Sequence, residues 1–238
     1  MAITPDKQHV LIAGGTSGMG KALASILINE SFRVTVTGRS PEKIAAVEKE
    51  LPGVRAVRLD ATDRPALDDF FKKEGKFDHL VLAVSAGKGG GLFSTLSLTE
   101  LRTGFDQKFW PQLNTMQAAL PYMQKEGSIT FITAISSTSG LPGTSGLAAI
   151  NGALELMVPT LAKELKPLRI NAVSPGVIDT PWWDFLPADA KEKTFADYSA
   201  SIAVGRVGRP EEVASLLHEI IRNGYLNGVV IGCHGGLS

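Results

Sequence analysis

Short apolar segments rich in Val, Ile and Leu alternate along the chain with longer segments in which apolar residues recur at helical spacing. A buried strand needs a continuous apolar run and an amphipathic helix needs one apolar face, so the two patterns predict different elements. The predicted strands are HVLIAGG, FRVTVTGR, VRAVRLDATD, FDHLVLAVSAG, GSITFITAISS, LRINAVSPGV and LNGVVIGCHGG. The predicted helices cover 18–30, 41–51, 63–73, 99–124, 147–164 and 210–222.

This alternation predicts βαβ units, in which each helix returns the chain so that successive strands run parallel. We therefore expect an α/β fold with a single Rossmann-type, doubly wound parallel sheet of about seven strands. Helices should cover both faces of the sheet, and the crossovers should be right-handed. No repeat, low-complexity tract or linker interrupts the pattern, so residues 1–238 are predicted to form one domain.

The composition excludes several classes of function. Lys plus Arg equal Asp plus Glu at 24 each, so we expect neither nucleic acid nor an anionic membrane as a partner. No run of eighteen apolar residues occurs, and Gly14 lies where a secretory core would fall, so no membrane span or leader is predicted. The only cysteine is Cys233, which excludes an intrachain disulfide and favours a cytoplasmic protein. The four histidines are scattered, so no metal site is expected.

A glycine-rich turn, AGGTSGMG at 13–20, lies between the first predicted strand and the first predicted helix. Glycine gives such a turn its backbone freedom and allows a pyrophosphate to approach the helix N-terminus. The spacing of Gly14, Gly18 and Gly20 departs from the G-x-G-x-x-G fingerprint, and a glycine-rich turn can also serve folding alone. Its position between a strand and a helix favours nucleotide binding.

Two residues at the ends of the next strands refine this prediction. Arg39 follows the second strand where an NAD site would have an acid, and its planar donors suit the 2′-phosphate of NADP(H). The alternative is a solvated loop arginine. Asp60 ends the third strand and is placed to accept a hydrogen bond from the adenine amino group. Its alternative is a role at the start of the next helix, where Asp63 also suits an N-cap.

The chain resembles the short-chain dehydrogenase/reductase family over essentially its full length. AGGTSGMG is similar to that family's T-G-x-x-x-G-x-G cofactor turn, with Ala13 in place of the usual threonine. RINAVSPGVIDTP, VGRVGRPEEVA and IGCHGG match its later segments. Together with the residues above, the resemblance predicts contacts with NADP(H) from Gly14, Thr16, Ser17, Gly18, Met19, Gly20, Arg39, Asp60, Ala61, Val84, Ser85, Ala86, Gly87, Pro175, Gly176, Val177, Ile178 and Thr180.

The resemblance also implies a catalytic Asn, Ser, Tyr and Lys, with Tyr and Lys four residues apart on one helix face. The serine is predicted to be Ser137, or alternatively Ser136. The family's usual spacing from that serine places Ile150 and Leu154 at the Tyr and Lys positions, where they are expected to pack as apolar residues. Lys108 lies where the family has asparagine. The usual proton donor is therefore predicted to be absent.

Two hypotheses follow from this altered site. In the first, the protein is an atypical NADP(H)-dependent oxidoreductase in which Ser137 orients an oxygen and Lys108 supplies the proton or charge. The substrate would be a small organic carbonyl or alcohol, or an activated C=C bond whose proton could come from water. Lys108 could instead point to solvent or pair with Asp106 or Glu155. In the second hypothesis, the protein binds NADP(H) as a sensor or partner subunit without hydride transfer.

The segment at about 181–204 is expected to form a lid over the substrate, because family members carry one there. Trp182, Trp183 and Phe185 would give it a stacking surface, although lid aromatics often pack only against helices. Tyr198 could replace the missing phenol or lie at the surface. Relatives commonly form dimers or tetramers, and the apolar segments FDQKFWPQLNTMQAAL and AAINGALELMVPTLA allow a homo-oligomer.

Overall fold

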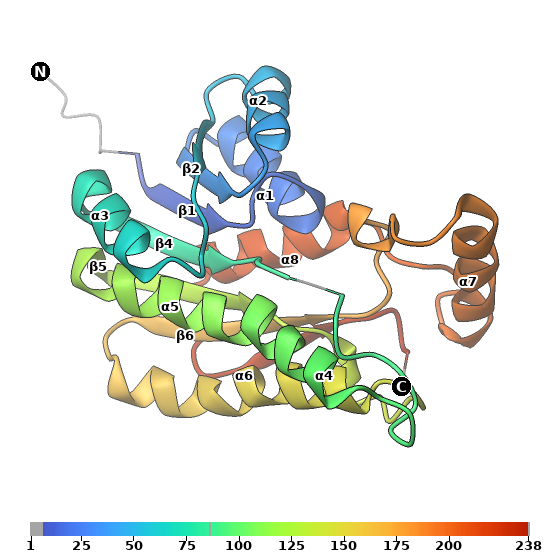
Figure 1. The fold of residues 1–238 in the computed structure, drawn as a ribbon. Helices are drawn as coiled ribbons and strands as arrows, with labels where there is room; N and C mark the ends of the chain where they lie inside the picture. The colour runs from blue at the N-terminus through green and yellow to red at the C-terminus, as the bar shows by residue number, and fades with distance from the viewer. Residues whose placement is uncertain (1–6, 86, 238) are drawn as a thin grey trace, which may run out of the picture.

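The computed structural model describes residues 7–85 and 87–237, and within them seven parallel strands form a sheet (Figure 1). The strand order is β3-β2-β1-β4-β5-β6-β7, which confirms the predicted doubly wound α/β fold. The order reverses between β1 and β4, which leaves a crevice outside the carboxyl ends of these strands. The strands are β1 (His9–Ala13), β2 (Arg33–Gly38), β3 (Arg55–Arg58), β4 (Phe77–Leu82), β5 (Met123–Ile132), β6 (Arg169–Pro175) and β7 (Val230–Cys233).

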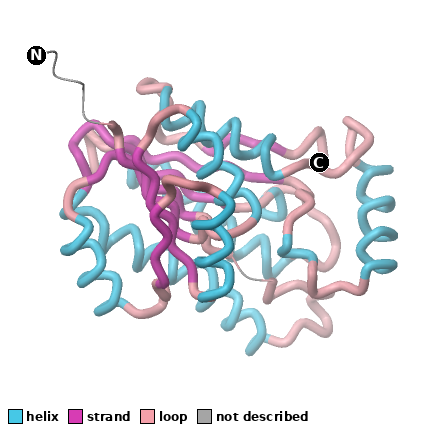
Figure 2. The backbone as a smooth tube through the Cα atoms, turned by 90° about the horizontal axis from the view of Figure 1, so that it is seen from above, coloured by secondary structure: helices cyan, strands magenta, loops and turns pink. Residues whose placement is uncertain are grey.

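Helices cover both faces of the sheet, as Figure 2 shows from above. Successive side chains of a strand point to opposite faces, so Val10 and Ile12 of β1 contribute to one apolar core and Leu11 and Ala13 to the other. The first core is closed by α1 (Gly18–Asn29), α2 (Pro41–Glu50) and α8 (Pro210–Arg222). The second is closed by α3 (Arg64–Glu74), α5 (Trp110–Ala119) and α6 (Ser145–Glu164).

The predicted single helix over 99–124 is wrong, because this stretch is built from several pieces. It consists of α4 (Leu98–Gly104), a π-helical turn (Phe105–Phe109), α5 and a 3₁₀ turn (Leu120–Tyr122), and β5 already begins at Met123. Pro111 has no N–H to donate to residue 107, and its ring would clash with that carbonyl, so the regular ladder widens there. Pro121 lies in the 3₁₀ turn that ends the helical stretch.

Two further segments bear on the site. The predicted lid contains a 3₁₀ turn (Pro181–Trp183) and α7 (Ala188–Ser201), a helix that the sequence pattern did not predict. In Figure 1, α7 stands at the right, apart from the helices that cover the sheet.

Helix α6 is long and apolar enough to cross a membrane by length and composition alone, but Ile150, Leu154 and Val158 are buried in this protein. Helices of a folded core commonly pass that test.

Candidate functional site

A cavity of about 540 Å³ lies at the carboxyl ends of the central strands, lined mainly by loops that follow β1, β2, β3, β4, β5 and β6. Its size is typical of a cofactor or ligand site. Predicted site residues that line it are Gly14, Thr16, Ser17, Gly18, Met19, Gly20, Arg39, Asp60, Ala61, Val84, Ser85, Lys108, Pro175, Gly176, Val177, Ile178 and Thr180. Ser137 and Gly87 are not among the lining residues, and Ala86 lies outside the described residues.

The turn between β1 and α1 is packed so tightly that two of its glycines leave no room for a side chain. Gly14 has a φ of +82°, and a Cβ there would lie 2.8 Å from the carbonyl carbon of Ala83, the residue that directly follows β4. A Cβ on Gly20 would lie 2.7 Å from the carbonyl oxygen of Gly14. Ser17 precedes α1 without capping it through its side chain, so the first backbone N–H groups of α1 remain available to an anion. This cradle fits a pyrophosphate.

The far end of the cavity gathers positive charge and one carboxylate. Arg39 and Lys43, both exposed, line it together with Asp60. Hydrogen bonds from Thr62 hold the pKa of the Asp60 carboxyl below its usual value: the backbone N–H donates over 2.9 Å and the hydroxyl over 2.8 Å. The N-cap of α3 is Asp63, which accepts from the N–H of Ala66, so Asp60 does not cap that helix. The cations suit a phosphate, and Asp60 stays available as an acceptor.

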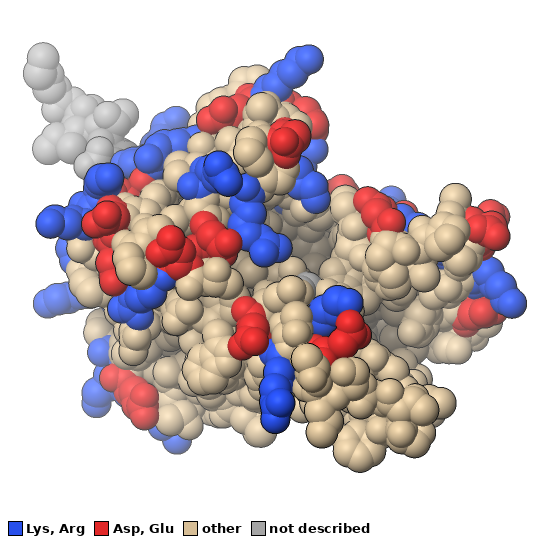
Figure 3. Space-filling view, viewed as in Figure 1, with Lys and Arg blue, Asp and Glu red and all other residues tan. Residues whose placement is uncertain are grey.

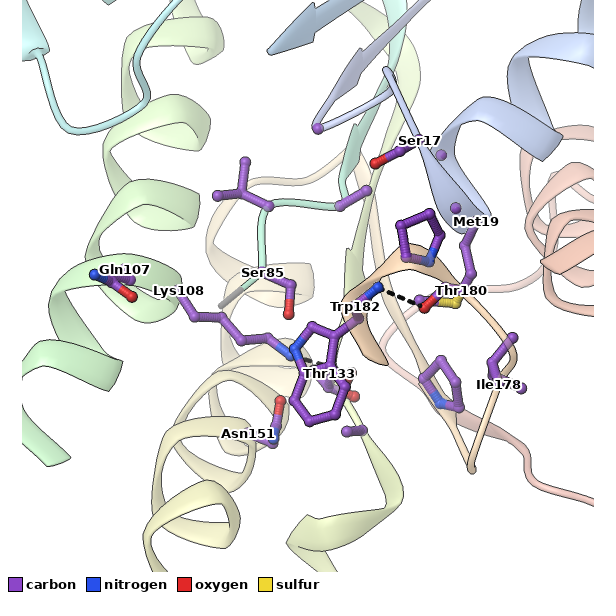
Figure 4. Close-up of a pocket in the computed structure, with 18 of the residues that line it drawn as sticks. Ser17, Met19, Ser85, Gln107, Lys108, Thr133, Asn151, Ile178, Thr180 and Trp182 are labelled. Carbon is purple, nitrogen blue, oxygen red and sulfur yellow. Dashed lines mark hydrogen bonds between the residues drawn. The ribbon is translucent and has the colours of Figure 1, made fainter. Parts of the chain in front are cut away.

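Lys108 comes from the π-helical turn and extends into the middle of the cavity (Figure 4). The side chain is buried, with only 7% of the residue exposed, so the prediction that it could point to solvent is wrong. Its ammonium donates to the carbonyl oxygen of Thr133 over 3.2 Å. Burial lowers the pKa of Lys108 to about 8, while the charge of Glu155 acts in the opposite direction. The hydroxyl of Thr133 donates to Glu155 over 2.6 Å, and among the described residues Lys108 forms no ion pair with Asp106 or Glu155.

Helix α6 brings one of the two predicted apolar positions to the cavity and leaves the other in the core. Ile150 and Leu154 are both buried, which confirms that they pack as apolar residues. Leu154, however, belongs to the core under the sheet and does not line the cavity. Only the first turns of α6 reach the cavity, through Leu147, Ile150 and Asn151. Leu154 lies almost one turn further along, so of the two predicted positions Ile150 lines the cavity and Leu154 packs in the core.

Asn151 is the site residue that the sequence reasoning missed. Its amide nitrogen donates to Ser136 Oγ over 3.0 Å and to the carbonyl oxygen of Leu147 over 2.9 Å, and its Oδ1 is buried without a partner among the described residues. The structure therefore brings Ser136 to the cavity, whereas Ser137 donates to the carbonyl oxygen of Ala134 and lies outside the lining. Asn151 is the one polar amide in the apolar run GLAAINGALELM, and that contrast was the available signal.

The predicted lid contributes three aromatic side chains to the cavity wall. Trp182, Trp183 and Tyr198 line it, whereas Phe185 is 64% exposed and does not. The indole N–H of Trp183 donates to the carbonyl oxygen of Ile178 over 3.0 Å, which fixes that ring against the end of β6. Trp182 enters the cavity on the side opposite Lys108 (Figure 4). These rings add an apolar wall to the polar centre.

Comparison with known proteins gives consistent matches over nearly the whole chain. A family model described as enoyl-(acyl carrier protein) reductase matches residues 13–238. The chain is 33% identical to 3-oxoacyl-(acyl-carrier-protein) reductase FabG of Thermotoga maritima, over 95% of this chain and 96% of that protein. A small-chain dehydrogenase solved in complex with NADPH is 30% identical, with a TM-score of 0.82 over 98% of this chain and 99% of that one. BdcA in complex with NADPH is 26% identical, with a TM-score of 0.85 over 97% and 94%.

Proposed function

The chain belongs to the short-chain dehydrogenase/reductase family of oxidoreductases, and from this we propose that it is an NADP(H)-dependent enzyme with a rebuilt catalytic site. Its substrate is a small organic carbonyl or alcohol, or an activated C=C bond. The observation that carries this proposal is the buried ammonium of Lys108 inside a cavity that can hold a dinucleotide.

The cofactor assignment is supported by the geometry of the cavity and by the NADPH complexes of two similar structures. The Gly14–Gly20 turn and the start of α1 would hold the pyrophosphate. Arg39 and Lys43 would hold the 2′-phosphate, and Asp60 would accept from the adenine amino group. The segment Pro175–Thr180 would line the nicotinamide. When bound, NADPH supplies the hydride.

The absence of the usual Tyr and Lys pair is part of the same proposal. Helix α6 contains no tyrosine, and its only lysine, Lys163, lies in its last turn and is exposed. The side chains that α6 turns toward the cavity are Leu147, Ile150 and Asn151. None of these can donate a proton to a developing alkoxide, because two are hydrocarbon and the third is an amide.

Lys108 is the group that replaces the missing donor. A carbonyl oxygen becomes negative as the neighbouring carbon is reduced, and a positive donor at that oxygen stabilises the developing charge. Within residues 7–85 and 87–237, the ammonium of Lys108 donates one hydrogen bond, to the carbonyl oxygen of Thr133, which leaves N–H groups for a substrate oxygen. A pKa of about 8 lets it be protonated at neutral pH and still release its proton to an alkoxide. Ser136 accepts a hydrogen bond from the amide of Asn151. Its hydroxyl would orient the substrate oxygen, which is the role predicted for Ser137.

The proposal is tested by titrating NADPH fluorescence and then screening aldehydes, ketones, quinones and enones. Lys108→Ala should bind NADPH as tightly as the wild-type protein and lose turnover. Lys163→Ala is the matched control, because that exposed lysine lies at the far end of α6. Unchanged turnover in Lys108→Ala would contradict the proposed role. Tight NADPH binding without oxidation by any compound would favour the sensor or partner-subunit hypothesis instead.

The organisation around this site completes the proposal. Residues 1–238 form one dinucleotide-binding domain, and the segment at about 181–204 acts as a substrate lid. The protein assembles as a homo-oligomer through α5 and α6, and the exposed Trp110 and Leu156 support such an interface. Sedimentation or light scattering of the wild-type protein beside a Trp110→Ser, Leu156→Ser variant would test the interface.

A further inference from the structure

The amide of Asn151 presents a buried acceptor to the cavity that no described residue satisfies. Only 3% of Asn151 is exposed, and both hydrogen bonds of its Nδ2, to Ser136 and to the carbonyl of Leu147, fix the orientation of the group. Its Oδ1 has no partner within the described part of the chain. A buried acceptor without a donor is unfavourable, so a bound ligand that brings an O–H or N–H to this point gains affinity.

A positively charged donor, the ammonium of Lys108, faces the same part of the cavity. The ammonium of Lys108 comes from the π-helical turn, and Asn151 reaches the cavity from α6. Figure 4 shows the two side chains directed toward the same central space, with Ser85 and Trp182 at its other sides. The site therefore offers a positive donor beside a neutral acceptor. A ligand that meets both must carry an acceptor for the ammonium and a donor for the amide oxygen.

The surface around the site restricts the rest of the ligand. Residues 89–99 and 127–154 contain no Asp, Glu, Lys or Arg, and Leu92, Phe93 and Leu98 are exposed. Figure 3 shows an uncharged region at the lower right, over the loop before α4, whereas charged side chains lie over the left and upper parts and over α7 at the right. Leu147, Trp182 and Trp183 line the cavity itself. Such walls suit a neutral, largely apolar molecule with a flat group.

We propose that the substrate is a free α-hydroxy ketone with an apolar, flat substituent, in which Lys108 binds the carbonyl oxygen and Asn151 Oδ1 accepts from the neighbouring hydroxyl. This inference rests on the proposed function. In the reduction, the carbonyl carbon receives the hydride that NADPH gives up and the C=O π bond opens. The carbonyl oxygen takes the proton of Lys108, which solvent then replaces. The products are a 1,2-diol and NADP⁺. Asn151 is the residue that selects the hydroxyl.

Binding to the NADP⁺-saturated protein tests the inference without turnover. Three probes differ only at one position: 2-hydroxyacetophenone, 2-methoxyacetophenone and acetophenone. We expect calorimetry to give a Kd for the hydroxy ketone at least about 10-fold below the Kd of the other two, because only it can donate to an acceptor. Equal Kd values for the three probes, or no binding of the hydroxy ketone, would overturn the inference. This comparison of ligands needs no variant.

Variants then assign the preference to Asn151. Asn151→Leu has a similar size but no acceptor and should reduce the preference to within about threefold, whereas Asn151→Asp keeps acceptor oxygens and should retain it. Asn114→Leu is the matched control, because Asn114 lies on α5 outside the cavity lining. An unchanged preference in Asn151→Leu would overturn the inference. So would a 10-fold loss of NADP⁺ affinity with the preference intact, because Oδ1 would then bind the cofactor.

These results are distinct from a failure of the proposed function. If NADPH did not bind, or if Lys108→Ala kept full turnover, the proposed function would fail. If the three probes bound equally while other ketones were reduced, only the inference about the hydroxyl would fail.

Discussion

The two ends of the cavity are built in different ways. At the β1–α1 end the backbone forms the site, and Gly14 and Gly20 are needed because adjacent chain segments lie within van der Waals contact. At the α5–α6 end side chains form the site, and Lys108 and Asn151 come from helices whose backbones would accept other residues. The first end is therefore tied to the fold itself. The second can be rebuilt without changing the fold, and we infer that this is what has happened here.

The largest effect should come from placing a side chain in the glycine cradle. Gly14→Val would put its Cβ 2.8 Å from the backbone of Ala83 at a φ of +82°, which a β-branched residue does not adopt without strain. We expect NADPH binding to be lost and the free energy of unfolding to fall by several kcal/mol, on the order of 3. Fluorescence titration and urea denaturation measure the two effects. Gly152→Ala is the control, because a Cβ at that position would have no contact within 4 Å.

The next effect concerns Lys108 and separates activity from stability. Lys108→Met should reduce kcat by roughly 10²–10⁴-fold, the typical contribution of a positioned acid, and leave NADPH affinity within about threefold. The same change should stabilise the fold, because it removes a buried charge. A Tm below that of the wild-type protein would show that the ammonium is well satisfied and that its burial carries no cost.

The pH dependence of the wild-type protein sharpens this prediction. The folded pKa of Lys108, about 8, lies below the ordinary 10.5, so between these values the unfolded chain binds more protons than the folded protein. The contribution of Lys108 to the free energy of unfolding should therefore increase as pH rises from 8 to 10.5, by at most roughly 3 kcal/mol. The turnover rate should fall over the lower part of that range as the donor loses its proton. Lys108→Met should show neither change.

A smaller effect is expected at the exposed cations of the nucleotide end. Arg39→Ala should weaken NADPH binding by roughly 10- to 100-fold and leave NADH binding within about twofold, because only NADPH carries the 2′-phosphate. Lys49→Ala, on α2 but outside the cavity lining, is the matched control. An equal loss for both cofactors would mean that Arg39 supports the loop rather than the phosphate.

The smallest effect distinguishes the two serines. Ser136→Ala removes the hydroxyl that accepts from Asn151 and should lower kcat/KM by roughly 3- to 10-fold. Ser137→Ala should change kcat/KM by less than about twofold, because its hydroxyl bonds to the carbonyl of Ala134 and does not line the cavity. The opposite order would restore the role predicted for Ser137 from the sequence.

The fold and the nucleotide end could be predicted from the sequence because each depends on local patterns. The seven strands were identified by their apolar runs, and helices 18–30, 41–51 and 210–222 agree with α1, α2 and α8 to within one residue at each end. The single helix predicted over 99–124 does not form, because Pro111 interrupts the regular hydrogen-bond ladder and the chain takes the π-helical turn that carries Lys108. The unpredicted α7 has no buried residue, and its apolar periodicity is correspondingly weak.

The sequence alone determined the parallel α/β architecture and the glycine cradle, because hydrophobic periodicity and backbone freedom are properties of neighbouring residues. Only the tertiary structure decided which side chains meet. Almost one helical turn separates Asn151, at the cavity, from Leu154, in the core, and a 3₁₀ turn places Ser136 rather than Ser137 beside Asn151. A shift of one residue turns a helical side chain to another face, whereas a shift of about one turn keeps the face and moves the side chain along the helix, here from the cavity into the core. The start of each element, and the packing that fixes it, therefore set the chemistry of the cavity.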